Sequence, residues 1–192
     1  ESGKLTLPIV GVTNRSEQNA KDFLSTLKNP PQYFSRQKLI QESDLIVEAA
    51  SGSIVPELAK EVFKLGKDLM IISIGALIEN PDIISLAQKN KCKIYAPSGA
   101  IAGLDGIKSA SIGKIYSVTM ITKKPLDALE GSPYLVDRQI SVLKFKDEQE
   151  IFSGTAREAC IGFPANINVS AAVSFAGIGP DKTKIQIYAS PK

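Results

Sequence analysis

The sequence predicts an α/β protein, with a Rossmann-like parallel sheet in its first part and an α+β domain after it. As far as residue 96, short apolar runs alternate with amphipathic stretches, which is typical of strands joined by crossover helices. From about residue 113 the strand-like segments instead alternate apolar and polar side chains. We therefore expect a Rossmann-type domain over residues 1–112 and an α+β domain over residues 113–192.

Local signals place the elements of the first domain. Ser16 is a suitable N-cap for a helix that ends before Asn29-Pro30-Pro31, and Pro56 opens a helix that Gly66 ends. Leu45-Ile46-Val47 is apolar throughout, which predicts a strand that is buried on both faces. The other expected strands are residues 7–13, 69–73 and 93–96, and the other helices are 36–42 and 82–89.

The second domain is expected to contain strands over residues 114–122 and 183–188 and helices over 155–163 and 167–176. The first strand is predicted from its alternation and the second helix from its many Ala, Val and Ser residues. Residues 123–150 are rich in Lys, Asp, Pro and Gly and predict a looser segment.

Composition excludes several classes of function. No run of about 18 apolar residues is present, so we expect no membrane partner. A net charge of +3 over 192 residues is too weak to indicate a nucleic-acid partner. The sequence contains no histidine, and Cys92 and Cys160 lack metal-ligand spacing, so we expect no metal site. A cytoplasmic protein with reduced thiols is expected.

Small and polar residues follow each of the four expected strands of the first domain. In doubly wound sheets, ligands bind outside the carboxyl ends of the strands, where small residues allow a close approach to the backbone. Each segment alone is typical of a turn, but four in series favour a cofactor crevice. The four segments are Thr13-Asn14-Arg15, Glu48-Ala49-Ala50-Ser51-Gly52, Ser73-Ile74-Gly75-Ala76 and Pro97-Ser98-Gly99-Ala100.

Asn14 and Arg15 bear on the choice of cofactor. A carboxylate at the end of the second Rossmann strand holds the ribose hydroxyls of NAD, whereas neutral or basic residues accommodate the 2′-phosphate of NADP. The pair therefore favours a site that accepts NADP; the alternative is a solvated turn that caps the next helix. The glycine-rich turn G-x-G-x-x-G is missing. We expect that the Rossmann domain lacks its first strand and that turn, and that the second domain is incomplete at its C-terminal end.

Three stretches together carry a resemblance to a known family. They are PSGAIAGLDG at residues 97–106, FSGTAREACIGFPANIN at 152–168 and VSAAVSFAGIGPD at 169–181. With VEAA at 47–50 and SIGAL at 73–77 before them, the chain resembles the L-aspartate dehydrogenase family over nearly its whole length.

The resemblance implies an enzyme that oxidises L-aspartate to iminoaspartate with NAD or NADP. The product hydrolyses to oxaloacetate and ammonia, or feeds quinolinate synthesis in NAD biosynthesis. Members combine a Rossmann domain with an α+β substrate domain and commonly form homodimers. By the family pattern, Ala50, Ser51 and Ser73 line the cofactor cleft, and Ala100 and Asn166 lie at the nicotinamide end. A helix N-cap is the alternative role for Asn166.

The chain departs from the family pattern near its end. The family's catalytic histidine follows an Ala-Asp-Pro segment, which Ala189-Ser190-Pro191 matches except for Ser190. We therefore expect the catalytic histidine beyond Lys192 and name no catalytic residue here. Two alternatives stay open: a non-catalytic nucleotide-binding or dimerisation module, and another amino-acid dehydrogenase or reductase of the same two-domain plan.

Overall fold

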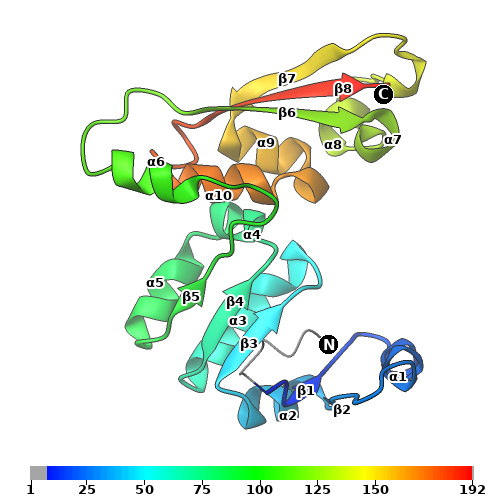
Figure 1. Ribbon diagram of the computed structural model, residues 1–192, viewed down its shortest axis with the longest axis vertical. Helices are drawn as coiled ribbons and strands as arrows, with labels where there is room; N and C mark the ends of the chain where they lie inside the picture. The colour runs from blue at the N-terminus through cyan, green and yellow to red at the C-terminus, as the bar shows by residue number, and fades with distance from the viewer. Residues whose placement is uncertain (1–7, 192) are drawn as a thin grey trace.

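The first part of the chain is built on a three-stranded parallel sheet (Figure 1). The computed structural model describes residues 8–191. The strands lie in the order β3 (Leu45–Glu48), β4 (Asp68–Ile71) and β5 (Ile94–Tyr95), and α3 (Val55–Lys64) and α5 (Asp82–Lys89) connect them. This arrangement confirms the predicted Rossmann-like class.

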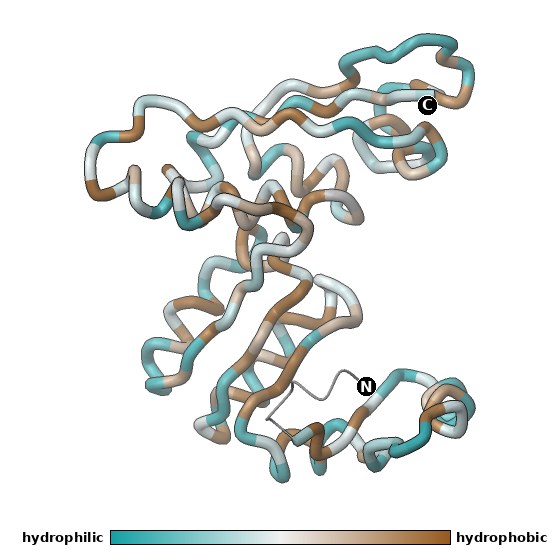
Figure 2. The backbone as a smooth tube through the Cα atoms, in the orientation of Figure 1, coloured by the Kyte–Doolittle hydropathy of each residue, from teal (hydrophilic) through white to brown (hydrophobic). Residues whose placement is uncertain are grey.

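One face of this sheet is buried and the other is exposed. Ile46, Leu69 and Ile71 are at most 5% exposed, because they belong to the hydrophobic core that α3 also enters. Val47 is 55% exposed, although the brown colour of β3 in Figure 2 marks this strand as hydrophobic. The prediction that this strand is buried on both faces is therefore wrong for the described residues, because an apolar run does not specify what covers it.

A separate two-stranded parallel sheet precedes the three-stranded one. It pairs β1 (Gly11–Val12) with β2 (Gln32–Tyr33), and among the described residues β1 is not hydrogen-bonded to β3. The strand expected over residues 7–13 is thus shorter, and Leu7 lies outside the described residues. β2 was not expected, since it is short, polar and preceded by two prolines. The helices of this part are α1 (Glu17–Ser25) and α2 (Arg36–Glu42).

The second part is a three-stranded mixed sheet with helices on one face. Its order is β6 (Thr119–Pro125), β8 (Lys184–Ser190) and β7 (Gln149–Thr155), with β6 parallel and β7 antiparallel to β8. Beneath it lie α9 (Ala156–Gly162) and α10 (Asn168–Ala176) (Figure 1). Ile185 and Ile187 of β8 are buried in the core between the sheet and the helices. The α+β class of this part is confirmed.

Several elements of this part differ from the sequence prediction. The strand expected to begin at residue 114 begins at Thr119, and the segment expected to be loose contains short helices and the start of β7. A helix of four or five residues has no periodicity that a sequence pattern can reveal. These elements are fixed by buried Leu129, Leu135 and Val142. The short helices of this segment are α7 (Leu126–Leu129) and α8 (Pro133–Asp137), with the 3-10 turn η2 (Val142–Lys144). Elsewhere in the chain lie α4 (Gly75–Glu79), α6 (Leu104–Ala110) and the 3-10 turns η1 (Gly52–Ile54) and η3 (Pro164–Asn166).

Among residues 8–191, none of the helices combines the length and the apolar character that crossing a membrane requires. The division of the chain at residues 112 and 113 stays a prediction. α6, which that division assigns to the first domain, packs beside α10 of the second: a Cβ built on Gly177 lies 3.4 Å from Cγ2 of Ile107.

Candidate cofactor site

A buried glutamate connects the turns that follow β3 and β4. Glu48 is 3% exposed, and its Oε1 accepts hydrogen bonds from the Ala50 amide at 2.7 Å and the Ser73 hydroxyl at 3.0 Å. Its Oε2 accepts a third from the Ser73 amide at 3.0 Å. A carboxylate removed from water needs such donors, and bonds to a charged acceptor are the stronger kind. Glu48 therefore holds the two turns in a fixed relation.

The turn after β3 also approaches the start of α4. A Cβ built on Gly52 lies 3.6 Å from Cβ of Ala76, which is ordinary contact distance. Ala50 and Ser51 are exposed in this turn, and the Ser51 hydroxyl lies 2.9 Å from that of Ser53. The structure thus brings Ala50, Ser51 and Ser73 to one edge of the sheet. Their contact with a cofactor remains a prediction.

The loop after β5 approaches the second part of the chain. Gly99 has a positive φ of 66°, which favours glycine, and a Cβ built on it lies 3.9 Å from Cγ2 of Val169 in α10. Ala100 follows in this loop and is exposed. Asn166 ends η3, two residues before α10 begins. Gly99, next to Ala100 in the chain, and Asn166 thus both lie near the start of α10, and the roles of Ala100 and Asn166 stay predictions.

Asn14 and Arg15 lie apart from these residues. Oδ1 of Asn14 accepts a hydrogen bond from the Ser16 amide at 3.2 Å, and the Ser16 hydroxyl caps α1 through the Asn19 amide at 3.3 Å. The pair thus forms the capping turn that was one of its two interpretations. In Figure 1, β1 and α1 lie at the bottom of the molecule, whereas α9 and α10 lie in its upper half. Contact of Arg15 with a cofactor stays a prediction.

Two contacts that sequence reasoning missed join α4 to the second part of the chain. Oδ1 of Asn168 accepts a hydrogen bond from the Gly75 amide at 3.3 Å, and Arg157 donates to the Ile78 carbonyl at 2.8 Å. The role of Glu48 was also missed. Its signal was a single charge within the apolar run LIVEAA, whereas Asn168 and Arg157 are distant in sequence from their partners and gave none.

The thiols do not contribute a nucleophile. Burial raises the pKa of Cys160 to about 12, and it also raises the pKa of Cys92. A thiol whose pKa is raised above its ordinary value stays protonated at neutral pH and is a poor nucleophile. Within residues 8–191, no three His, Cys, Asp or Glu side chains are grouped as a metal site requires.

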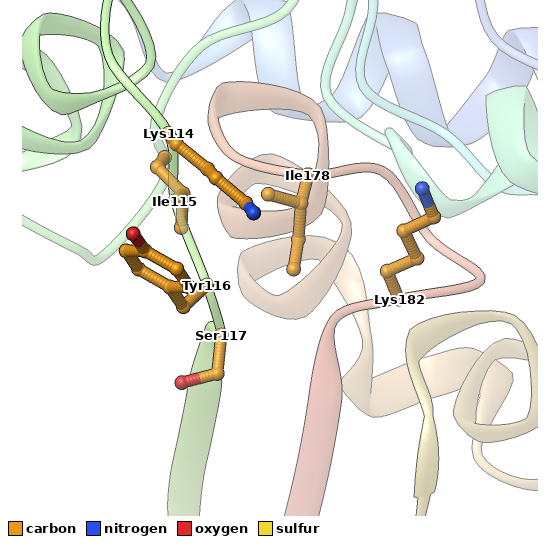
Figure 3. A pocket seen from close by; sticks show the side chains of 6 residues that line it. All are labelled: Lys114, Ile115, Tyr116, Ser117, Ile178 and Lys182. Atoms are coloured by element: carbon orange, nitrogen blue, oxygen red, sulfur yellow. The ribbon is translucent and has the colours of Figure 1, made fainter.

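Two hollows lie in the second part of the chain, away from the predicted cofactor residues. The larger, about 590 Å³, is lined by residues that include Lys114, Ile178 and Lys182 (Figure 3). The other, about 330 Å³, lies beside Tyr134, where the Arg138 guanidinium stacks 3.7 Å from the ring centre. Neither hollow includes the residues expected to line the cofactor cleft.

Similarity to known proteins decides the family. Residues 1–97 match the family model "Homoserine dehydrogenase, NAD binding domain", and residues 105–192 match "Aspartate dehydrogenase, C-terminal". The L-aspartate dehydrogenase of Methanosarcina acetivorans is 38% identical over all of this chain and 72% of its own length. The chain belongs to the L-aspartate dehydrogenase family. The L-aspartate dehydrogenase of Bradyrhizobium diazoefficiens is 42% identical over 97% of the chain, which covers 66% of that relative.

A solved structure has a similar fold. The crystal structure of aspartate dehydrogenase from Thermotoga maritima superposes with a TM-score of 0.68 at 24% identity, over 94% of this chain and 78% of the other. At that identity the likeness shows the fold alone. The chain spans about two thirds to three quarters of the length of these L-aspartate dehydrogenases.

Proposed function

We propose that this chain belongs to an enzyme that oxidises L-aspartate to iminoaspartate with NAD or NADP, after which water releases oxaloacetate and ammonia. The observation that carries this proposal is the 38% identity with an L-aspartate dehydrogenase over the whole chain. The match to an NAD-binding family model over residues 1–97 supports the choice of cofactor.

The edge held by Glu48 fits a nicotinamide dinucleotide. Ala50 and Ser51 are small and exposed, so a flat ring or a phosphate can approach the backbone there. Because Glu48 accepts two hydrogen bonds from Ser73, we expect this turn to change little when the cofactor binds. Bound at this edge, NAD or NADP would supply the hydride acceptor for the reaction.

The family pattern suggests roles for Ala100 and Asn166, and the position after the second Rossmann strand suggests one for Asn14 and Arg15. Ala100 leaves space beside the nicotinamide, and the amide of Asn166 offers both a donor and an acceptor to its carboxamide. Arg15, with Asn14, binds the 2′-phosphate of NADP. By the family pattern, a catalytic histidine would take the proton that accompanies hydride loss, and the sequence of 192 residues contains no histidine.

We also propose a homodimer in the cytoplasm that supplies iminoaspartate to NAD biosynthesis. The face of the second sheet that points away from α9 and α10 supports the dimer, because Ile121 on it is 60% exposed. Light scattering should give the mass of two subunits for the wild type and of one for Ile121→Glu. Ile84→Glu, on exposed α5 of the first part, is the control that should stay dimeric. A single-subunit mass for the wild type would rule the dimer out.

Steady-state kinetics test the proposed reaction. Full-length protein should form reduced cofactor, measured as absorbance at 340 nm, with L-aspartate but not with D-aspartate or L-malate. Reduction that depends on a different amino acid or on a hydroxy acid would favour another dehydrogenase of the same two-domain plan. A folded protein that binds NAD(P) but does not reduce it with any of these substrates would indicate a non-catalytic nucleotide-binding module.

A further inference from the structure

The short helix α4 lies where the two parts of the chain meet. It begins two residues after Ser73, at the edge proposed to bind the cofactor, and Gly75, Ala76, Leu77 and Ile78 are all buried. Its neighbours include α9 and α10 of the second part. A movement of α4 would therefore change the relation between the cofactor edge and the second domain.

A side chain of α10 binds the N-terminal end of α4. The Gly75 amide donates to Oδ1 of Asn168 at 3.3 Å, and the first amides of a helix have no partner within the helix. The approach is close, since a Cβ built on Gly75 would lie 2.8 Å from Cγ2 of Ile167. Only glycine fits this contact without a shift of the neighbouring side chain.

A side chain of α9 binds the C-terminal end of α4. Nη1 of Arg157 donates to the Ile78 carbonyl at 2.8 Å, which suits a cation because the last carbonyls of a helix lack partners and carry partial negative charge. The other edge of the guanidinium binds Asp181, with Nε–Oδ1 at 2.5 Å and Nη2–Oδ2 at 3.0 Å. Arg157 thus connects α4 to the turn before β8.

We propose that Arg157 and Asn168 are positioning residues that clamp α4 at both ends and so set the substrate domain against the cofactor edge. This inference rests on the proposed function. Neither residue is assigned a contact with substrate or cofactor. The guanidinium is required because it donates to the Ile78 carbonyl and to both oxygens of Asp181 in one plane, which an ammonium on a lysine cannot do.

Hydrogen exchange tests the clamp without cofactor or substrate. In Arg157→Lys, the backbone amides of residues 76–80 should exchange about tenfold faster than in the wild type, because a charge-assisted hydrogen bond is lost. Arg36→Lys is the matched control: Arg36 is similarly exposed and binds Glu57 and Glu61 within the first part. Unchanged exchange at residues 76–80 in Arg157→Lys, or equal acceleration in Arg36→Lys, would overturn the clamp.

Measurements of kcat per cofactor-binding site test whether the clamp affects catalysis. In the full-length enzyme, Arg157→Lys and Asn168→Ala should lower kcat about tenfold per cofactor-binding site, with the Kd for NAD(P) changed less than twofold. A merely structural role would reduce the number of binding sites and leave kcat per site unchanged, and that result would refute the proposal. If the wild type does not oxidise L-aspartate, the proposed function fails, and the exchange experiment still decides whether the clamp exists.

Discussion

Glu48 and Ser73 lie at the ends of neighbouring strands and are joined by two hydrogen bonds of 3.0 Å, one to the Ser73 amide and one to its hydroxyl. The bond from the Ala50 amide to the same carboxylate makes Glu48 the common acceptor of two turns. A charge that is 3% exposed is retained only where donors satisfy it. The edge proposed to bind the cofactor is therefore prearranged by one side chain.

Replacing Glu48 with glutamine should destabilise the fold. The amide has one acceptor oxygen where the carboxylate has two, so at least one of the three donors loses its acceptor, at a cost of about 1–3 kcal/mol. Urea unfolding should show a correspondingly lower free energy of unfolding for Glu48→Gln. Glu42→Gln, at an exposed position of α2, is the control and should stay within about 0.5 kcal/mol of the wild type. Equal effects of the two variants would contradict the role assigned to Glu48.

The sequence predicted those parts of the fold that depend on local signals. The helices expected over residues 36–42 and 82–89 have those bounds in the structure, and Ser16 caps α1 as predicted. Exposure was harder to predict because it depends on distant elements. Within α1, Leu24 is buried but its neighbour Phe23 is 65% exposed, although both side chains are apolar.

The residues of the candidate site also fall into those that local signals predicted and those that depend on distant contacts. Ala50, Ser51 and Ser73 were predicted to share an edge, because parallel strands end on one side of a sheet and their turns are marked by small residues. Oδ1 of Asn168, by contrast, accepts a hydrogen bond from the Gly75 amide, 93 positions away in the sequence. A single sequence carries no signal for such a pairing.

Replacing Gly75 with alanine should introduce a steric conflict. The new Cβ would lie 2.8 Å from Cγ2 of Ile167, and overpacking of this kind costs about 1–3 kcal/mol. Gly106→Ala is the control, because nothing lies within 4 Å of its Cβ position in α6 and alanine should stabilise the helix by up to about 1 kcal/mol. Thermal unfolding measures both.

The source of the Gly75→Ala effect can be isolated with a double-mutant cycle. Ile167→Ala should cost less in the Gly75→Ala background than in the wild type, since it removes the conflicting methyl group. Strictly additive effects would show that the two side chains do not compete for space.

Replacing Arg15 with alanine should change cofactor preference. If the guanidinium binds the 2′-phosphate, its loss should lower kcat/KM for NADP about tenfold or more, with little change for NAD. Parallel kinetics with the two cofactors give this ratio. Lys28→Ala, at an exposed position beyond α1, should leave it unchanged. An equal loss with NAD and NADP would show that Arg15 has another role.

The buried thiol of Cys160 should make stability depend on pH in the alkaline range. Its pKa rises from an ordinary 9.0 to about 12 because burial disfavours the thiolate. Above pH 9 the unfolded chain releases this proton and the folded chain retains it, so the contribution is complete below pH 9 and is lost towards pH 12. The free energy of unfolding should therefore fall more steeply between pH 9 and 10.5 for the wild type than for Cys160→Ala. An equal dependence of the free energy of unfolding on pH in the wild type and in Cys160→Ala would contradict the raised pKa of Cys160.

Transfer of deuterium tests the central claim most directly. Full-length enzyme is incubated with L-aspartate deuterated at its α-carbon and with oxidised cofactor, and the reduced cofactor is analysed by mass spectrometry and proton NMR. We predict that the label appears at C4 of the nicotinamide ring, because that atom receives the hydride from the α-carbon of aspartate. Reduced cofactor without the label, or no reduced cofactor from a folded protein that binds it, would contradict an L-aspartate dehydrogenase activity.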